Sequence, residues 1–125
     1  MISIVDDDES VREATKSFVR SLGYEAMTFG SAEEFLESAH LMATACLITD
    51  VQMPGLNGVE LQDRLIADGH RTAVIFVTGF PDERLQGRVL RRGAIGYLPK
   101  PFNEDRLIAC IDVALANHKC RSAER

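Results

Sequence analysis

Short apolar runs alternate with longer amphipathic segments along the whole chain, and this alternation restricts the possible folds more than any other feature of the sequence. The apolar runs cover residues 2–5, 24–28, 45–49, 73–77 and 95–98. The runs at 45–49 and 73–77 are almost continuously apolar and contain β-branched residues, which is the pattern of a strand buried on both faces. Such strands belong to parallel sheets that helices cover on both sides.

The segments between these runs carry apolar residues at three- and four-residue spacing, which places them on one stripe of a helix. The expected helix starts are Asp8 with Glu9, Ser31 with Glu34 as a capping box, Asn57 with Glu60, and Asp82. The expected buried stripes are Val11, Ala14, Phe18 and Leu22; Phe35, Leu36 and Ala39; Leu61, Leu65 and Ile66; Leu85, Val89 and Leu90; and, in a last helix from about 103 to 117, Leu107, Ile108, Ile111, Ala114 and Leu115. Gly87 lies inside the fourth helix, so we predict that this helix is the weakest, because glycine costs about 1 kcal/mol relative to alanine.

Five strands and five helices in strict alternation predict a doubly wound α/β fold, because crossovers between parallel strands are right-handed. The 125 residues are the usual size of one domain. With 46% hydrophobic and 26% charged residues, the chain has the composition of a folded globular protein. No apolar run approaches the roughly 18 residues of a membrane helix, and the first ten residues predict no secretory leader.

The net charge, the distribution of charge and the cysteine content reduce the number of possible function classes. The net charge of −5 disfavours nucleic-acid binding by this domain as a whole. Residues 1–60 hold 11 acids and 3 bases, whereas residues 61–125 hold 8 acids and 11 bases, so we expect either an acidic pocket opposite a partner-facing surface or solvated helix faces. Three cysteines, Cys46, Cys110 and Cys120, show no disulfide or zinc spacing and fit a reducing cytoplasm.

Polar residues follow four of the five predicted strands at the ends where a doubly wound fold places its site. Asp6 and Asp7 follow the first strand, Asp50 the third, Thr78 the fourth and Lys100 the fifth. Converging carboxylates repel each other, so either one takes up a proton or a cation lies among them. Carboxylate oxygens with water in the remaining positions suit Mg²⁺, and a hydroxyl with an amine suits a phosphoryl group.

At these residues the chain resembles the receiver domains of bacterial two-component response regulators. The matching pieces are IVDDD at 4–8, LITDVQMPGLNGVEL at 47–61, FVTG at 76–79 and GYLPKPF at 96–102. They occur in family order and with family spacing over nearly the whole chain. The chain looks most similar to the receivers of two-domain transcription regulators with a LuxR-type output domain. The resemblance implies a flavodoxin-like fold with strand order 2-1-3-4-5.

The resemblance also implies a role for each residue at the strand ends. Asp50 would be the nucleophile that takes a phosphoryl group from a phosphohistidine of a sensor histidine kinase. Asp6, Asp7, Asp50 and the backbone carbonyl of Gln52 would hold Mg²⁺ or Mn²⁺. Beyond its own phosphorylation and dephosphorylation, the chain would catalyse no reaction, so it would not be an enzyme in the usual sense.

Further implied roles concern the response to phosphorylation. Lys100 would pair with the phosphoryl group, and the Lys100–Pro101 peptide bond would be cis. Thr78 would turn toward a phosphoryl oxygen, and Tyr97 would turn inward with it as the switch aromatic, so that the fourth helix and fifth strand change. Gln52 and Phe80 occupy positions that influence how fast water removes the phosphoryl group. These two differ from each other in chemistry, since Gln orients water and Phe obstructs it.

Partner surfaces are expected on the second half of the chain. The fourth helix carries Arg84, Arg88, Arg91 and Arg92, which fit an acidic partner, a second copy of the chain, or a solvated basic face. The resemblance implies a homodimer through the fourth helix, fifth strand and fifth helix, and DNA contact only through a separate or missing output domain. We expect no membrane contact. The receiver would span residues 1–118, with 119–125 as a tail or the start of a linker.

Two other functions share parts of this pattern. A Mg²⁺-dependent phosphohydrolase of the haloacid dehalogenase type needs a second aspartate two residues after the nucleophile, where this chain has Gln52. A receiver-like domain that works without phosphorylation does not need the full set of strand-end residues that is present here. A flavodoxin-like electron carrier shares the fold class, but no Ser/Thr/Gly phosphate loop follows the first strand.

Overall fold

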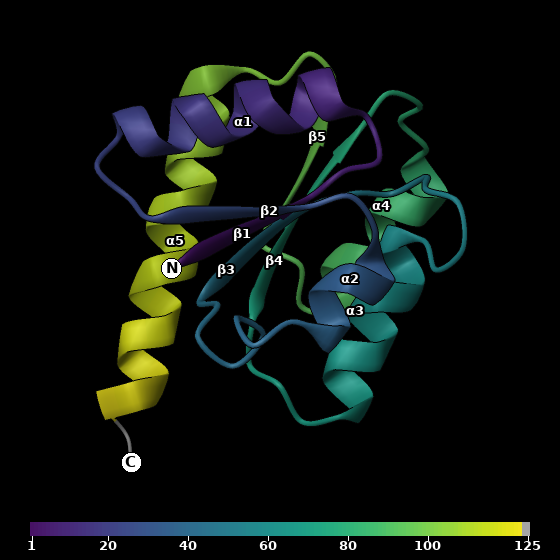
Figure 1. The fold of residues 1–125 in the computed structure, drawn as a ribbon. Coiled ribbons are helices and arrows are strands. Elements are labelled where there is room, and N and C mark those ends of the chain that lie inside the picture. Colours follow the sequence, from purple (N-terminus) through teal and green to yellow (C-terminus); the bar gives the residue numbers. More distant parts are fainter. Residues whose placement is uncertain (124–125) are drawn as a thin grey trace.

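The computed structural model describes residues 1–123, and the side chains of residues 1–116. Within this range the chain forms one parallel sheet of five strands in the order β2-β1-β3-β4-β5 (Figure 1). The strands are β1 (Ile2–Val5), β2 (Ala26–Phe29), β3 (Cys46–Asp50), β4 (Ala73–Thr78) and β5 (Gly96–Pro99). The predicted doubly wound fold and its strand order are therefore confirmed.

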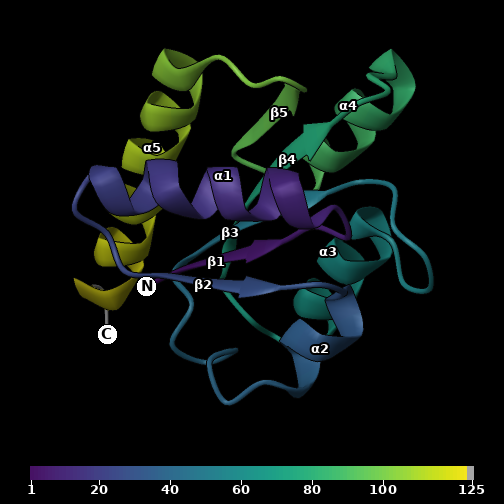
Figure 2. The same cartoon turned by 45° about the horizontal axis from the view of Figure 1, so that its top comes forward.

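Helices cover both faces of the sheet. The helices are α1 (Glu9–Ser21), α2 (Ala32–Glu37), α3 (Gly58–Ala67), α4 (Glu83–Arg91) and α5 (Glu104–Ala123). Figures 1 and 2 show α1 and α5 on one side of the sheet and α2, α3 and α4 on the other. Among the described residues, no helix combines the length and the apolar character needed to cross a bilayer.

The core consists of two layers, because successive side chains of a strand point to opposite faces of the sheet. Ile4, Ile48 and Ile75 face α1 and α5, where they pack in one cluster with Val19, Leu107 and Ile111. Val5, Leu47 and Phe76 belong to the other cluster, which contains Phe35, Leu61, Leu65 and Val89 of the opposite helices. The strands β1, β3 and β4 contribute side chains to both clusters, so the packing on both faces fixes the position of their carboxyl ends.

The β2 strand begins two residues later and ends one residue later than the predicted run at 24–28. Pairing with β1 sets its position, since Ile2 is opposite Ala26 and Val5 is opposite Phe29. Gly23 adopts a φ of 95°, which ends the preceding turn before the strand begins. The last helix is longer than predicted and continues to Ala123, because no glycine or proline interrupts residues 104–123.

The helix caps agree with the sequence at most positions. Asp8 and Asp82 accept hydrogen bonds from backbone N–H groups in the first turns of their helices, and Asn57 forms a complete capping box with Glu60. Ser31 accepts from the backbone N–H of Glu34, but the carboxylate of Glu34 accepts from Gly30 instead of Ser31. The predicted capping box at Ser31 is therefore only half formed.

Some predicted stripe residues are not part of the core. Ala14 and Ala39 are exposed, and Ile66 and Leu90 are 44% and 41% exposed. Ile66 and Leu90 each follow a buried residue of the same helix and are turned by about 100° away from it. Ala39 lies beyond the end of α2, and Ala14 precedes Thr15, which is the residue of α1 that turns toward the sheet with Val19.

The two cysteines with described side chains differ in burial. Cys46 is fully buried on β3, and burial raises the pKa of its thiol to about 12, with a smaller contribution from Cys110. Cys110 of α5 is only partly buried, so its predicted place in the core is half right. Cys120 lies outside the described side chains. A Cβ atom added to Gly96 would lie 2.6 Å from the Cys110 sulfur, so the α5 helix rests directly on the backbone of β5.

We expect Gly96→Ala to destabilise the chain by about 1–3 kcal/mol, because the added methyl group overpacks the contact with Cys110. The double variant Gly96→Ala/Cys110→Ala removes the opposing sulfur and should recover part of this loss. Urea unfolding of the wild type, both single variants and the double variant measures the coupling. Strictly additive free energies of unfolding would contradict the packing argument.

Candidate functional site

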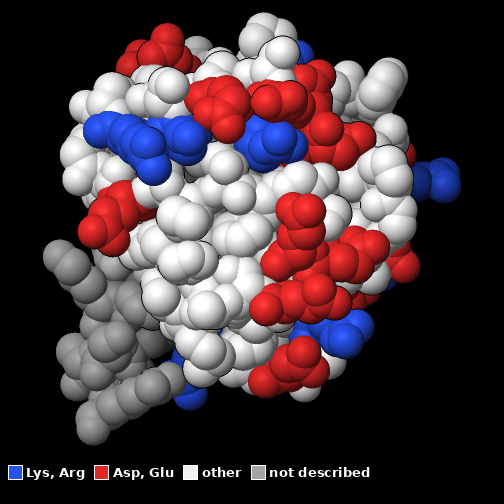
Figure 3. Space-filling view, in the orientation of Figure 1, with Lys and Arg blue, Asp and Glu red and all other residues white. Residues whose placement is uncertain are grey.

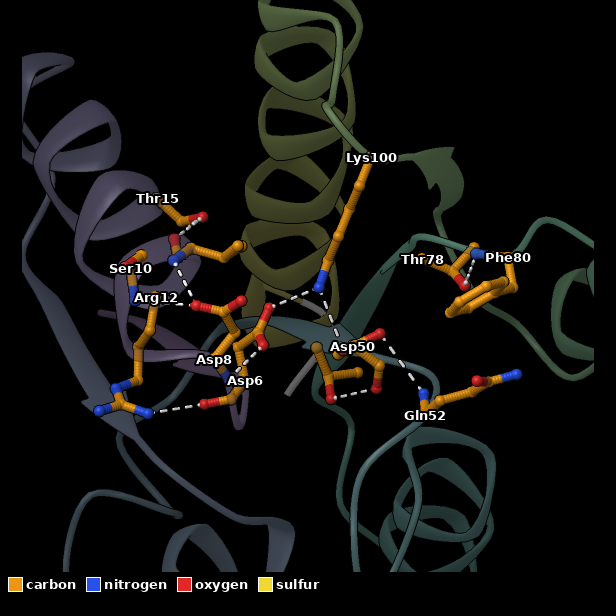
Figure 4. Close-up of polar contacts among 12 residues, drawn as sticks. Asp6, Asp8, Ser10, Arg12, Thr15, Asp50, Gln52, Thr78, Phe80 and Lys100 are labelled. Carbon is orange, nitrogen blue, oxygen red and sulfur yellow. Dashed lines mark hydrogen bonds and ion pairs between the residues drawn. The ribbon is translucent and has the colours of Figure 1, made fainter.

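One lysine joins two carboxylates at the carboxyl edge of the sheet. The Lys100 ammonium donates to Asp6 Oδ2 at 2.9 Å and to Asp50 Oδ2 at 3.1 Å. Figure 4 shows the Lys100 side chain pointing down between these two aspartates. The three residues come from the ends of β1, β3 and β5, so the sheet brings together groups that are 50 and 94 positions apart in the sequence.

Burial shifts the pKa values of the charged groups at this edge. Asp6 is 5% and Asp50 is 8% exposed. Burial raises the pKa of Asp50, although its hydrogen bond and charge interaction with Lys100 act in the opposite direction. Burial on its own would lower the pKa of Lys100, but the hydrogen bonds to Asp6 and Asp50 outweigh it and the pKa is raised. Lys100 is therefore held as a cation between the two carboxylates.

A third carboxylate completes an acidic cluster. Oxygens of Asp6, Asp7 and Asp50 all lie within 4.8 Å of one another, and Asp7 is exposed to solvent. Three carboxylates with an open side match the donor set that Mg²⁺ prefers, since this ion keeps several waters. The residues present therefore fit a divalent cation.

Backbone contacts fix Asp50 and the loop that follows it. The backbone N–H of Gln52 donates to Asp50 Oδ1 at 3.4 Å, and the Thr49 hydroxyl donates to the Asp50 carbonyl at 3.0 Å. The Gln52 side chain is exposed and extends away from Asp50 (Figure 4). The expected role of the Gln52 carbonyl as a metal ligand stays a prediction.

Thr78 and Tyr97 both contact the loop between β4 and α4. The Thr78 hydroxyl accepts from the backbone N–H of Phe80 at 3.1 Å, and in Figure 4 it is turned toward Phe80 and not toward Asp50. Tyr97 is buried, and its hydroxyl accepts from the backbone N–H of Asp82 at 3.2 Å. Asp82 caps α4, so the two predicted switch residues are linked to this helix through one short loop.

Lys100 also anchors the strand ends through its backbone. Its N–H donates to the Thr78 carbonyl at 2.7 Å, and the Lys100–Pro101 peptide bond is cis. Phe80 is 71% exposed beside the site. The side chains expected at the site thus lie around a single edge, with Asp6, Asp50 and Lys100 in direct contact and Thr78 and Tyr97 turned to the neighbouring loop.

Sequence reasoning gave no role to Gly58, which lies directly against the backbone of Asp50. A Cβ atom at Gly58 would overlap the Asp50 carbonyl oxygen, and the Gly58 N–H donates to the Val51 carbonyl at 2.9 Å. The available signal was a glycine directly after the helix cap Asn57, in the first position of α3. Only a residue without a side chain allows α3 to start so close to Asp50.

Comparisons with known proteins agree with this geometry. The family model of the response regulator receiver domain matches residues 2–112. The response regulator protein TmoT of Ectopseudomonas mendocina is 40% identical over 115 residues, which are 92% of this chain and 52% of TmoT. The transcriptional regulatory protein FixJ of Bradyrhizobium diazoefficiens is 34% identical over 114 residues, covering 91% of this chain and 56% of FixJ. The chain thus spans about half the length of these curated relatives.

A solved structure extends the likeness to three dimensions. The response regulator StyR superimposes with a TM-score of 0.91 at 39% identity, covering 99% of this chain and 63% of StyR. The likeness therefore includes the whole sheet and the edge that carries Asp6, Asp50 and Lys100.

We expect Gly58→Ala to lower the free energy of unfolding by about 1–3 kcal/mol and to weaken Mg²⁺ binding, because the new methyl group displaces the Asp50 carbonyl. Gly87→Ala is the matched control, since a Cβ atom there meets only the flexible end of Arg91. That variant should gain up to about 1 kcal/mol from helix propensity. Urea unfolding and calorimetric Mg²⁺ titration of both variants measure these effects, and equal behaviour of the two would contradict the close approach.

We expect Lys100→Met to tighten Mg²⁺ binding by about tenfold, equivalent to about 1.4 kcal/mol. The ammonium occupies the same carboxylates as the metal, so its removal leaves a more negative site. Without metal the variant should unfold at a lower temperature than the wild type, and Mg²⁺ should restore much of the difference. Lys16→Met removes the same charge from the surface of α1 and should leave the affinity unchanged. Weaker Mg²⁺ binding by Lys100→Met would show that the lysine organises the site more than it repels the metal.

Proposed function

The chain belongs to the response regulator receiver domain family of two-component systems, and from this premise we propose that Asp50 accepts a phosphoryl group from a phosphohistidine of a sensor histidine kinase. One observation carries the proposal: the Asp50 carboxylate lies at the open edge of the sheet, bound by the Lys100 ammonium and next to two further carboxylates. This arrangement gives a carboxylate nucleophile, a cation beside it and a place for Mg²⁺.

The proposed transfer forms one bond and breaks one. An oxygen of the Asp50 carboxylate attacks phosphorus, the phosphorus–nitrogen bond of the phosphohistidine breaks, and its electron pair stays on the imidazole. The product is an acyl phosphate on Asp50. Asp6, Asp7, Asp50 and the backbone carbonyl of Gln52 would hold Mg²⁺ or Mn²⁺, which when bound neutralises charge on the phosphoryl oxygens.

In this proposal the new phosphoryl oxygens rearrange the hydrogen bonds of Lys100 and Thr78. The Lys100 ammonium gains an acceptor that carries more charge than a carboxylate. The Thr78 hydroxyl leaves the Phe80 N–H and turns toward the phosphoryl group. Because the Tyr97 hydroxyl holds the Asp82 N–H at the start of α4, a shift of this loop is passed to α4 and β5.

The proposal also limits what the chain catalyses. It would accelerate only its own phosphorylation and dephosphorylation, with no external substrate. Gln52 and Phe80 are both exposed beside Asp50, so they are placed to influence the approach of water to the acyl phosphate. The free thiols of Cys46 and Cys110 support the proposal that the protein acts in the reducing cytoplasm.

The proposed output surface is formed by α4, β5 and α5, through which two phosphorylated copies would form a homodimer. Arg88 of α4 and Arg92, the cap directly after this helix, pair with Asp63 of α3, with nitrogen–oxygen distances of 3.2 Å and 2.9 Å. Two of the four predicted basic residues therefore already have an acidic partner inside the domain. Arg84 and Arg91 are exposed and are left for a second copy or an acidic target.

We further propose that residues 1–118 are the receiver and that 119–125, of which 119–123 continue α5, begin a linker to an output domain. The relatives support this, because FixJ is named a transcriptional regulatory protein and the chain covers 56% of its length. DNA contact would then belong to the output domain and not to the acidic receiver. Residues 124–125 of the proposed linker lie outside the described residues.

Intact mass after incubation with Mg²⁺ and acetyl phosphate tests the proposed function. We expect one added phosphoryl group on the wild type and none on Asp50→Asn or on a sample with the metal chelated, because the nucleophile and its charge neutralisation are then missing. Asp112→Asn makes the same chemical change at an exposed position of α5 and should still be phosphorylated.

The remaining outcomes separate the alternatives. An unmodified wild type with unconsumed acetyl phosphate would contradict the proposal and favour a receiver that works without phosphorylation. Consumption of acetyl phosphate without an adduct would point to rapid turnover at Asp50, and Asp50→Asn would then have to abolish the consumption. Modification of Asp50→Asn to the same extent as the wild type would place the reaction at another residue.

A further inference from the structure

A side chain of α1 contacts the loop that carries Asp6 and Asp7. Arg12 reaches back over the first turn of its helix, and its guanidinium Nη1 donates to the Asp6 carbonyl oxygen at 2.8 Å. Figure 4 shows this side chain beneath the aspartates, on the side away from Lys100. Asp6 is the first residue after β1, so its carbonyl lies just beyond the end of the strand.

With this contact, Asp6 is fixed at every polar atom. Its N–H donates to the Phe29 carbonyl at 3.2 Å, and its Oδ1 accepts from the Asp8 N–H at 2.9 Å. Its Oδ2 accepts from Lys100. Asp8 is itself the cap of α1, so the segment from Asp6 to Asp8 is bound at both ends and Asp7 is placed between two fixed neighbours.

The guanidinium of Arg12 lies between the loop after β1 and the loop after β2. A Cβ atom added to Gly30, in the loop after β2, would lie 3.4 Å from Arg12 Nη1. The Arg12 N–H donates to the Asp8 carbonyl at 2.9 Å, which fixes the base of the side chain in the first turn of α1. Arg12 thus binds the loop after β1 and lies close to the loop after β2.

Arg12 also belongs to a row of basic residues along α1. Arg12, Lys16 and Arg20 follow each other at four-residue spacing, and Figure 3 shows basic side chains in a row over this helix. Lys16 pairs with Glu13 on the helix surface. Arg20 repeats the arrangement of Arg12 in part, because its Nη2 donates to the Ala26 carbonyl at 3.2 Å, again six residues away. The row therefore contains two carbonyl contacts, of which only that of Arg12 reaches the acidic cluster.

We propose that Arg12 is a positioning residue for the divalent cation site, which sets the Asp6–Asp7 loop in the geometry that binds Mg²⁺. This inference rests on the proposed function, since that function places the metal on Asp6, Asp7 and Asp50. Mg²⁺ requires nearly ideal octahedral geometry, so ligands on a loop that is already ordered bind it with a smaller loss of conformational freedom. Groups that hold metal ligands in place often contribute tenfold or more to affinity.

The charge of Arg12 acts in the opposite direction to its positioning role. A guanidinium near the site repels a dication, so loss of the charge alone would strengthen Mg²⁺ binding. Loss of the anchored carbonyl would weaken it. The sign of the change therefore separates a positioning residue from a surface charge.

Calorimetric titration of the 125-residue chain with Mg²⁺ tests the inference. We expect Arg12→Ala to bind Mg²⁺ about tenfold more weakly than the wild type. Arg20→Ala, which loses the matched carbonyl contact on the same helix, should stay within about twofold, since Ala26 is remote from the cluster. Arg12→Lys keeps a donor on a shorter side chain and should recover part of the affinity.

Thermal unfolding of each variant in the absence of metal accompanies the titrations. If Arg12→Ala is unfolded at the assay temperature, Arg12→Lys decides the question at the same temperature, and reduced affinity in that folded variant supports the inference. Unchanged or tighter binding by the folded variants would overturn it, and so would an equal loss in Arg20→Ala. A wild type that does not bind Mg²⁺ would instead overturn the metal site of the proposed function itself.

Discussion

The attraction between one buried ammonium and two buried carboxylates is the interaction on which the rest of the site depends. Asp6, Asp7 and Asp50 bring three like charges to one edge of the sheet, and two of them are almost completely buried. Without a cation this arrangement is unfavourable, because buried charges lose their hydration and repel each other. Lys100 offsets the repulsion by bonding to two of the three carboxylates. The parallel sheet makes this contact possible, since its strands deliver their carboxyl ends to the same edge.

Under the proposed function, the contacts of α4 are the route by which a change at this edge would reach the surface. Within the described residues, α4 has one fully buried side chain, Val89, and the partly buried Leu85 packs against the same core cluster. Gln62 of α3 donates to the Val89 carbonyl at 3.1 Å, Asp63 pairs with two arginines, and Tyr97 holds the loop at the start of the helix. The ion pairs of Asp63 are largely exposed to solvent and contribute little to stability, whereas the loss of a buried hydrogen bond or a large apolar contact is expensive. The weakness expected of this helix at Gly87 stays a prediction.

The sequence predicted the fold well because apolar periodicity and strand-end chemistry are local signals. It located all five strands, the caps Asp8, Asn57 and Asp82, and the residues that meet at the edge of the sheet. The prediction was wrong where tertiary contacts determine the structure. Pairing with β1 sets the start of β2, and the orientation of α3 and α4 on the sheet leaves Ile66 and Leu90 exposed. Gly58 and Arg12 escaped notice for the same reason, since each acts on a backbone carbonyl and no pattern of side chains reports that.

Contacts to backbone carbonyls explain how the few residues of the site are held in fixed positions. The carboxylates have few side-chain partners, yet the Asp6 carbonyl accepts from Arg12, the Thr78 carbonyl accepts from the Lys100 N–H, and Gly58 lies directly against the Asp50 carbonyl. The Lys100 ammonium stands at the end of a long side chain that is 20% exposed, so it can follow a change of charge at the site. Under the proposed function, a phosphoryl group on Asp50 would draw that one cation toward new oxygens and away from Asp6. The acidic cluster would then rely on the divalent cation, so that phosphorylation and metal binding would support each other at the same edge of the sheet.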